Sequence, residues 1–352
     1  MDTTEKLLKA LTEAHGVPGY EDEVRALVRS YMEPLGEIQQ DNIGSVICRL
    51  DGNGPKVMLA GHMDEIGFMV RHVTAEGFLK FVPLGGWWDQ VLLGQRVIIK
   101  THQGDITGVI GAKPPHLLSA DERKKLVEKQ DMYIDIGATS AQEVAQAGLR
   151  VGDPVVPAAQ FTPLVGKTYL SKAFDDRVGC ALVIQALQHL AQTSHPNVIF
   201  GTATVQEEVG LRGAGTSAEL VNPDVAIILE SDIAGDVPGI KDEESALKLG
   251  QGPTLVLYDR TMVPNLKLRD LVIDTAQALE IPLQFSAIPG GTDGGAIHRH
   301  KAGVPAVVLG VAARHIHSHG AIIHRQDYDR ALKLLLEVVG KLDAPTVASL
   351  TA

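Results

Sequence analysis

The chain has 352 residues, 45% of them hydrophobic, and its 43 acidic against 32 basic side chains give a formal net charge of −11. A chain of this length is longer than one ordinary hydrophobic core usually accommodates, so we expect two structural units, or one large α/β domain with an insertion. The negative charge argues against a nucleic-acid partner and favours cations or cationic groups as ligands. With only two cysteines, Cys48 and Cys180, a disulfide framework is excluded.

The N-terminal segment MDTTEKLLKALTEAHG has the pattern of a capped amphipathic helix and lacks the apolar core of a signal peptide. No apolar run of about 20 residues, the length that crosses a bilayer, occurs elsewhere in the chain. We therefore expect a soluble, cytoplasmic protein with no membrane partner.

A second amphipathic pattern covers residues 19–36 and predicts another helix, which ends near Pro34 and Gly36. The β-branched runs SVICRL and KVMLAGHMDEIGFMV follow, separated by the turn DGNGP. From about residue 68 to residue 165, short strands with many glycines and prolines predict the hairpins of a small barrel or sandwich.

Helices and strands alternate again from residue 171 to the end of the chain. The predicted order is a helix over 171–192, strand NVIFGTATV, a helix near 213–220, strand DVAIILE, a helix over 265–280, strand PLQFSAI, a helix, strand PAVVLGV, and a final helix from about 326. This alternation predicts an α/β fold, a mostly parallel sheet sandwiched by helices. We expect a discontinuous catalytic domain, residues 1–67 and 166–352, interrupted by an inserted β-rich domain, residues 68–165.

Ionisable side chains gather directly after predicted strands. They are His62 and Asp64 after KVMLAG, Glu207 and Glu208 after VIFGTATVQ, Glu230 and Asp232 at the end of VAIILESD, and His315, His317 and His319 after PAVVLGV. In an open α/β sheet, ligands bind in the crevice outside the carboxyl ends of the strands. Histidine and carboxylates without thiolate suit zinc, cobalt or manganese in a catalytic site.

Six blocks resemble, in this order, the tetrahedral (TET-type) aminopeptidases, a group with glutamyl, leucyl and deblocking members. The blocks are GHMDEIGFMV, SKAFDDRVGC, VQEEVGLRGAG, ILESD, PGGTDGGAIH and ARHIHS. The resemblance runs from the first helix to the last and implies a zinc-peptidase-like domain with two divalent metal ions, zinc or cobalt first and manganese next. It also implies that the inserted β domain makes subunit contacts in a homo-oligomer, a dodecamer built from dimers.

The same resemblance assigns five metal ligands. His62 and Glu230 would hold the first ion, and Glu208 and His317 would hold the second. Asp175 would bridge the two ions, while Asp176 would bond to the backbone or to a ligand. Two alternatives stay open, Asp176 in place of Asp175 and Asp232 in place of Glu230.

Two carboxylates have expected catalytic roles. Glu207 resembles the general base that takes a proton from the metal-bridging water and passes it to the leaving amine. Because adjacent side chains of an extended chain point apart, Glu207 and Glu208 are expected to have different partners. Asp64 lies two residues after His62, on the same face of an extended chain, so its carboxylate is expected to orient the imidazole.

The expected function is that of a metal-dependent aminopeptidase acting on peptides with a free N-terminus. One alternative is a glycoside hydrolase with Glu207 and Glu208 as its paired carboxylates, but such carboxyls must face each other across a bond, and aromatic residues make up only 4% of the chain. The other alternative is a non-catalytic assembly protein. Such a protein would have lost metal-ligand residues, and all the candidate ligands are present in this sequence. The preferred first residue, whether acidic, aliphatic or broad, is open.

Overall fold

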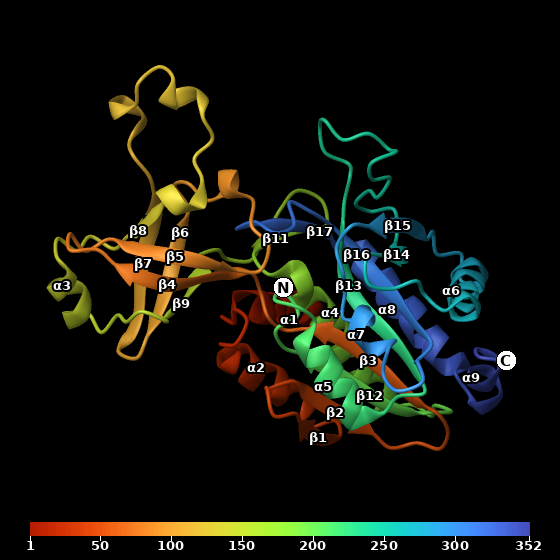
Figure 1. Ribbon diagram of the computed structural model, residues 1–352. Helices are drawn as coiled ribbons and strands as arrows, with labels where there is room; N and C mark the ends of the chain where they lie inside the picture. Colours follow the sequence, from red (N-terminus) through yellow and green to blue (C-terminus); the bar gives the residue numbers. More distant parts are fainter.

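The computed structural model describes residues 1–352 and consists of a helix-covered sheet beside a closed barrel (Figure 1). The sheet has eleven strands in the order β1-β2-β12-β3-β13-β16-β17-β11-β10, and β14 joins it through β16 and carries β15. The strands are β1 (Glu37–Gln40), β2 (Val46–Leu50), β3 (Lys56–His62), β10 (Thr162–Pro163), β11 (Thr168–Ser171), β12 (Val198–Thr204), β13 (Val225–Ile233), β14 (Thr254–Asp259), β15 (Gln284–Ile288), β16 (Ala306–Arg314) and β17 (Ala321–His324).

Four adjacent strands at the centre of the sheet, β12, β3, β13 and β16, are parallel. The strands that flank them pair antiparallel, so parallel pairing is confined to this centre and to β14 with β15. The central strands are almost wholly buried, because helices cover both faces of the sheet.

The helices are α1 (Thr3–Glu13), α2 (Asp22–Met32), α3 (Ala141–Gln146), α4 (Phe174–Leu190), α5 (Arg212–Val221), α6 (Leu266–Ala278), α7 (Gly294–Ile297), α8 (Arg325–Lys341) and α9 (Ala344–Ser349). Buried side chains of α1, α2, α4, α6 and α8 form one core with one face of the sheet, and α5 and α7 cover the other face. Alternate residues of β3 enter the two cores, Leu59 the first and Met58 the second.

The barrel closes in the order β4-β5-β8-β7-β6-β9, with every pair antiparallel. Its strands are β4 (Gly67–Val73), β5 (Leu79–Leu84), β6 (Arg96–Thr101), β7 (Gly104–Gly111), β8 (Tyr133–Asp135) and β9 (Pro154–Pro157). A separate core of 15 buried residues fills it. Short 3₁₀ turns follow β5 (Asp89–Val91) and lie between β7 and β8 (Pro115–Leu117, Glu122–Lys124 and Lys129–Asp131).

The α/β fold with an inserted small barrel is confirmed. The predicted strand KVMLAG corresponds to β3, which ends at His62 in the sheet, and the remainder of the run KVMLAGHMDEIGFMV enters the barrel as β4, which begins at Gly67. The division into a catalytic domain (1–67 and 166–352) and an inserted domain (68–165) stays a prediction. None of the helices is both long and apolar enough to cross a membrane.

Candidate metal centre

The five predicted ligands come together at the carboxyl ends of the central parallel strands. His62 is the last residue of β3 and Glu230 lies near the end of β13, while Glu208 follows β12 and His317 follows β16. Asp175 lies in the first turn of α4, which packs along β3 and β13. Separate strands thus deliver side chains to one crevice, as their position in the sequence predicts.

Two glycines allow the first turn of α4 to approach the sheet this closely. A Cβ on Gly61 would lie 2.8 Å from the carbonyl carbon of Gly179. A Cβ on Gly179, in turn, would lie 2.5 Å from the carbonyl oxygen of Leu229 in β13. Both distances are shorter than real Cβ contacts, so a larger residue at either position would push Asp175 away from the strands.

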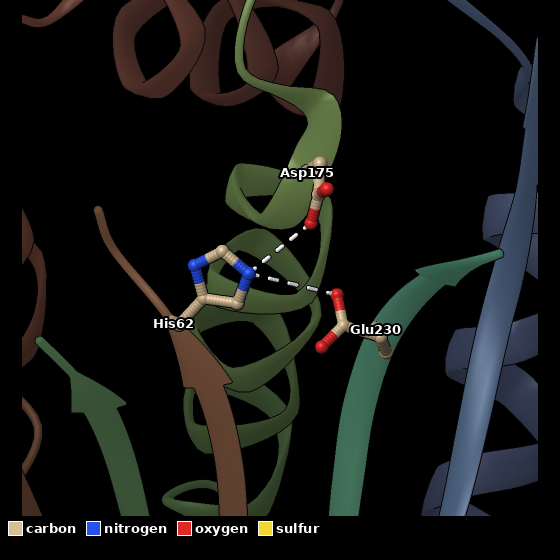
Figure 2. Close-up of side chains that lie close together, drawn as sticks. All are labelled: His62, Asp175 and Glu230. Atoms are coloured by element: carbon tan, nitrogen blue, oxygen red, sulfur yellow. Dashed lines mark hydrogen bonds and ion pairs between the residues drawn. The ribbon is translucent and has the colours of Figure 1, made fainter. Parts of the chain in front are cut away.

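The first group of donors consists of His62, Asp175 and Glu230 (Figure 2). Nε2 of His62 lies 3.1 Å from Oδ1 of Asp175 and 3.8 Å from Oε1 of Glu230. The His62 and Glu230 side chains are buried, with 2% and 8% of their surface exposed. One atom from each residue can therefore face a common point from which solvent is largely excluded.

The second group consists of Asp175, Glu208 and His317, so Asp175 belongs to both groups. Nε2 of His317 lies 3.0 Å from Oδ2 of Asp175 and 3.4 Å from Oε1 of Glu208. Asp175 turns Oδ1 toward His62 and Oδ2 toward His317. In each group the donor atoms lie within 4.8 Å of one another.

Backbone carbonyls orient both imidazole rings. Nδ1 of His62 lies 3.0 Å from the carbonyl oxygen of Asp64, and Nδ1 of His317 lies 2.8 Å from that of Gly86. A proton held on Nδ1 by the carbonyl would make the Nε2 lone pair available to a metal ion, which is the tautomer that a metal ligand requires.

The Asp64 carboxylate holds the loop that carries the two glutamates. It is fully buried and accepts hydrogen bonds from the backbone N–H groups of Glu207, at 3.0 Å, and Glu208, at 3.1 Å. Its Oδ1 also lies 3.5 Å from Nδ1 of His62. The sequence predicted only the contact between Asp64 and His62. The hydrogen bonds to Glu207 and Glu208 were not predicted, because the chain leaves the extended conformation after β3.

The extended-chain argument for Glu207 and Glu208 is corrected by the structure. β12 ends at Thr204, and Gln206 has a φ of 57°, so both glutamates lie in a turn rather than on a strand. They still have different neighbours, since Glu208 belongs to the second donor group and Glu207 to neither. Both side chains line the same cavity.

The three glutamates of the site lie in surroundings that disfavour their negative charge, whereas Asp175 does not. Burial raises the pKa of Glu230 and Glu207 well above the ordinary value, and raises the pKa of Glu208 to about 8. Burial also acts to raise the pKa of Asp175, but hydrogen bonds with His317 and His62 outweigh it and lower the pKa.

These groups fit divalent cations. Oε1 of Glu208 is buried and has no hydrogen-bond partner, although it faces Nε2 of His317. An orphaned carboxylate oxygen among buried carboxyls requires positive charge nearby. Two dications, with histidine and carboxylate donors and no thiolate, would supply it.

The alternative ligands point elsewhere. The Asp176 carboxylate accepts hydrogen bonds from the backbone N–H groups of His62, at 3.1 Å, and Gly179, at 2.9 Å. The Asp232 carboxylate accepts from the backbone N–H of Ile233 and from the Ser286 hydroxyl. Neither aspartate belongs to a donor group.

The cavity at the donor groups has a volume of about 770 Å³. Its walls include residues 289–292, from the glycine-rich loop PGGTDGGAIH, and the exposed Arg260. Asp293, the next residue of that loop, is buried and accepts a hydrogen bond from the Thr204 hydroxyl. The loop therefore forms part of the cavity wall.

A buried ionic network lies behind the site, and the sequence reasoning missed it. Nζ of Lys172 lies 2.5 Å from Oε1 of Glu65, and a guanidinium nitrogen of Arg177 lies 3.7 Å from the same oxygen. Lys172 and Arg177 also donate to the carbonyl of Ala14, just after α1. The available signal was that Glu65 follows Asp64 directly, while Lys172 and Arg177 flank Asp175 in SKAFDDR.

A helix-covered α/β sheet with histidine and carboxylate donors at its strand ends is the architecture of a metal-dependent hydrolase. The model of the M42 glutamyl aminopeptidase family matches residues 44–334, and a second model, AMPT, matches residues 2–27. The chain therefore belongs to the M42 family and is an aminopeptidase, a hydrolase of peptide bonds. The resemblance found in the sequence is confirmed.

The chain is similar over nearly its whole length to known aminopeptidases. It is 36% identical to the glutamyl aminopeptidase of Lactococcus lactis subsp. cremoris strain MG1363, covering 97% of this chain and 98% of the relative. It is 34% identical to the lysyl aminopeptidase of Pyrococcus furiosus, covering 96% and 98%.

Solved structures agree with these relatives. The TET aminopeptidase of Thaumarchaeota archaeon SCGC AB-539-E09 superposes with a TM-score of 0.97 at 49% identity, covering 99% of both chains. The TET1 peptidase of Pyrococcus horikoshii, which can assemble into a tetrahedron or a large octahedral shell, superposes with a TM-score of 0.86 at 31% identity, covering 97% of this chain and 100% of the other.

Proposed function

We propose that the chain is a dinuclear metal aminopeptidase that removes the first residue from peptides with a free N-terminus. The observation that carries this proposal is the shared Asp175, whose two carboxylate oxygens face different histidines. One carboxylate between two donor groups suits a pair of adjacent cations better than two unrelated sites.

His62, Glu230 and Asp175 would hold one ion, and Glu208, His317 and Asp175 the other. When bound, two divalent ions polarise the scissile carbonyl and acidify a water molecule toward neutrality. The donor types favour zinc or cobalt, with manganese as the third option. Five protein ligands for two ions leave coordination positions open to substrate and water.

Glu207 is the general base of this proposal. Its carboxylate lines the cavity without belonging to a donor group, so its oxygens are free to take a proton from water and give it to the leaving amine. Asp64 holds the backbone N–H of Glu207 and so fixes the start of that side chain. Asp64 is thus a positioning residue that links the base to the loop after His62.

The glycoside hydrolase alternative has less support. Glu208 lies in a donor group with His317 and Asp175, which removes one member of the carboxylate pair that a glycosidase needs. Membership of the M42 aminopeptidase family also argues against a glycoside hydrolase.

We further propose that the region 68–165 makes subunit contacts in a homo-oligomer, a dodecamer built from dimers. The shell formed by the TET1 peptidase of Pyrococcus horikoshii supports this proposal. The segment between β7 and β8 also exposes two large apolar side chains, Leu117 at 70% and Leu126 at 72%. Light scattering at micromolar concentration should give a dodecamer mass, and a fully active monomer would contradict the proposal.

Metal removal tests the proposed function. A chelator should abolish release of leucine from an unblocked peptide, and cobalt or zinc should restore it, with elemental analysis giving two ions per chain at full activity. The N-acetylated form of the same peptide should resist hydrolysis throughout. Full activity of protein verified to be free of metal would refute the proposal, and saturation at one ion per chain would refute its dinuclear part.

A further inference from the structure

A second hollow adjoins the cavity of the metal centre. Its volume is about 1050 Å³, and its walls come from residues 86–95, at the edge of the barrel, and residues 315–320, after β16. The two cavities share Gly86, Ile316 and His317, whereas Arg260 and the glycine-rich loop line only the first. The second hollow, here called the Trp88 hollow, therefore begins at His317 and extends away from the glycine-rich loop.

The walls of the Trp88 hollow carry exposed apolar side chains among polar ones, which include Gln90, Gln95 and Ser318. Trp88 has 67% of its surface exposed and Leu93 has 38%, and both line the hollow. An exposed indole beside a cavity is a ready platform for an apolar or aromatic side chain. No other part of the chain covers this surface.

His319 closes the inner wall of the hollow. It is 9% exposed, it lines the hollow, and its ring centroid lies 5.3 Å from that of Trp87. Both of its ring nitrogens are buried and do not open onto the hollow. Binding in the hollow therefore relies on the exposed apolar side chains of Trp88 and Leu93.

Building on the proposed aminopeptidase function, we propose that the Trp88 hollow binds the part of the peptide that follows the scissile bond. A peptide whose first residue enters the first cavity must continue past the donor groups, and the shared wall at His317 gives it a continuous path. The second residue packs against Trp88 and Leu93, so apolar and aromatic residues are preferred there.

Substrate pairs test the preference at the second residue without any mutation. The metal-loaded enzyme should hydrolyse Leu-Phe-Ala with a kcat/KM about 10-fold higher than Leu-Gly-Ala, because a phenylalanine side chain loses much of its exposed surface on binding. Trp88→Ala should bring this ratio close to one. Tyr258→Ala, which also removes a half-exposed aromatic side chain but lines neither cavity, should leave the ratio as in the wild type.

Leucinamide, which has no second residue, separates this proposal from the function on which it rests. A metal-loaded enzyme that hydrolyses neither leucinamide nor peptides would refute both. Hydrolysis of leucinamide without any preference at the second residue would refute the Trp88 hollow alone. A changed particle mass for Trp88→Ala in light scattering, with an unchanged substrate ratio, would assign the hollow to a second copy of the chain and overturn the proposal.

Discussion

Replacing each of the two adjacent glutamates by glutamine separates proton transfer from metal binding. Asp64 holds the backbone N–H groups of both residues, so either substitution changes the side chain and leaves the turn in place. Glutamine keeps the size of glutamate, and neither Glu207 nor Glu208 makes a side-chain ion pair with lysine or arginine that would be lost. The two variants should therefore fold alike and differ in chemistry.

The expected magnitudes differ because the environments differ. Glu207 belongs to no donor group, so Glu207→Gln should lower kcat by a factor on the order of 10² to 10⁴, or about 3 to 5 kcal/mol of activation free energy, at unchanged metal content. Glu208 provides one of three donors in its group, so Glu208→Gln should lose metal first. Excess metal should recover part of the activity of Glu208→Gln and none of that of Glu207→Gln.

The assay combines elemental analysis of each purified variant with leucinamide turnover at limiting and saturating metal. Glu219→Gln is a matched control, since its carboxylate lies on α5, is 73% exposed and lines neither cavity. It should match the wild type in both measurements. If Glu207→Gln lost its metal while Glu208→Gln kept it, the roles would be reversed. If both variants stayed fully active, the proposed mechanism would be wrong.

Three further predictions concern the surroundings of the site. Lys172→Met leaves the buried Glu65 carboxylate without its close partner, so we expect a loss of about 3 to 5 kcal/mol in the free energy of unfolding by urea; an unchanged value would show that Arg177 alone neutralises the carboxylate. Burial raises the pKa of Glu21 from 4.5 to about 7. The Glu21 carboxyl therefore loses its proton near pH 4.5 in the unfolded chain and only near pH 7 in the folded protein. The free energy of unfolding should fall as the pH rises through this interval. Glu21→Gln should reduce this fall in the free energy of unfolding by up to about 3 kcal/mol. Curves of unfolding free energy against pH that run parallel for the wild type and the variant from pH 5 to pH 8 would refute this prediction. Arg260 is exposed and lines the first cavity, so Arg260→Ala should lower kcat/KM for a first-residue glutamate about 10-fold more than for leucine, whereas an equal effect on both would exclude it from first-residue recognition.

The sequence allowed the centre of the fold to be predicted because both faces of that part of the sheet are covered. DVAIILE and PAVVLGV are continuous apolar runs, and they became β13 and β16. The donor residues follow from the same reasoning, since parallel strands end at one edge. The short strands β1 and β17, of four residues each, carry no clear pattern and were not predicted.

Side-chain roles that depend on loops or on distant pairing could not be predicted. The Asp64 carboxylate bonds to backbone groups 143 and 144 positions away, and Glu65 meets Lys172 across 107 positions. No periodicity in the sequence records such pairs. The unpaired nitrogens of His319 depend in turn on how the barrel edge at Trp87 lies against the loop after β16.

The N-terminal helix is part of the scaffold of the metal centre. Arg177, two residues after Asp175, donates to the carbonyl oxygens of Leu11, Ala14 and Gly16 at the end of α1. When α1 detaches, these hydrogen bonds break and the first turn of α4 loses its support. Metal occupancy and docking of α1 are therefore thermodynamically linked, because an ion that binds only the intact site favours the attached helix. Amide hydrogen exchange in α1 should slow when metal is added, although no residue of that helix belongs to a donor group.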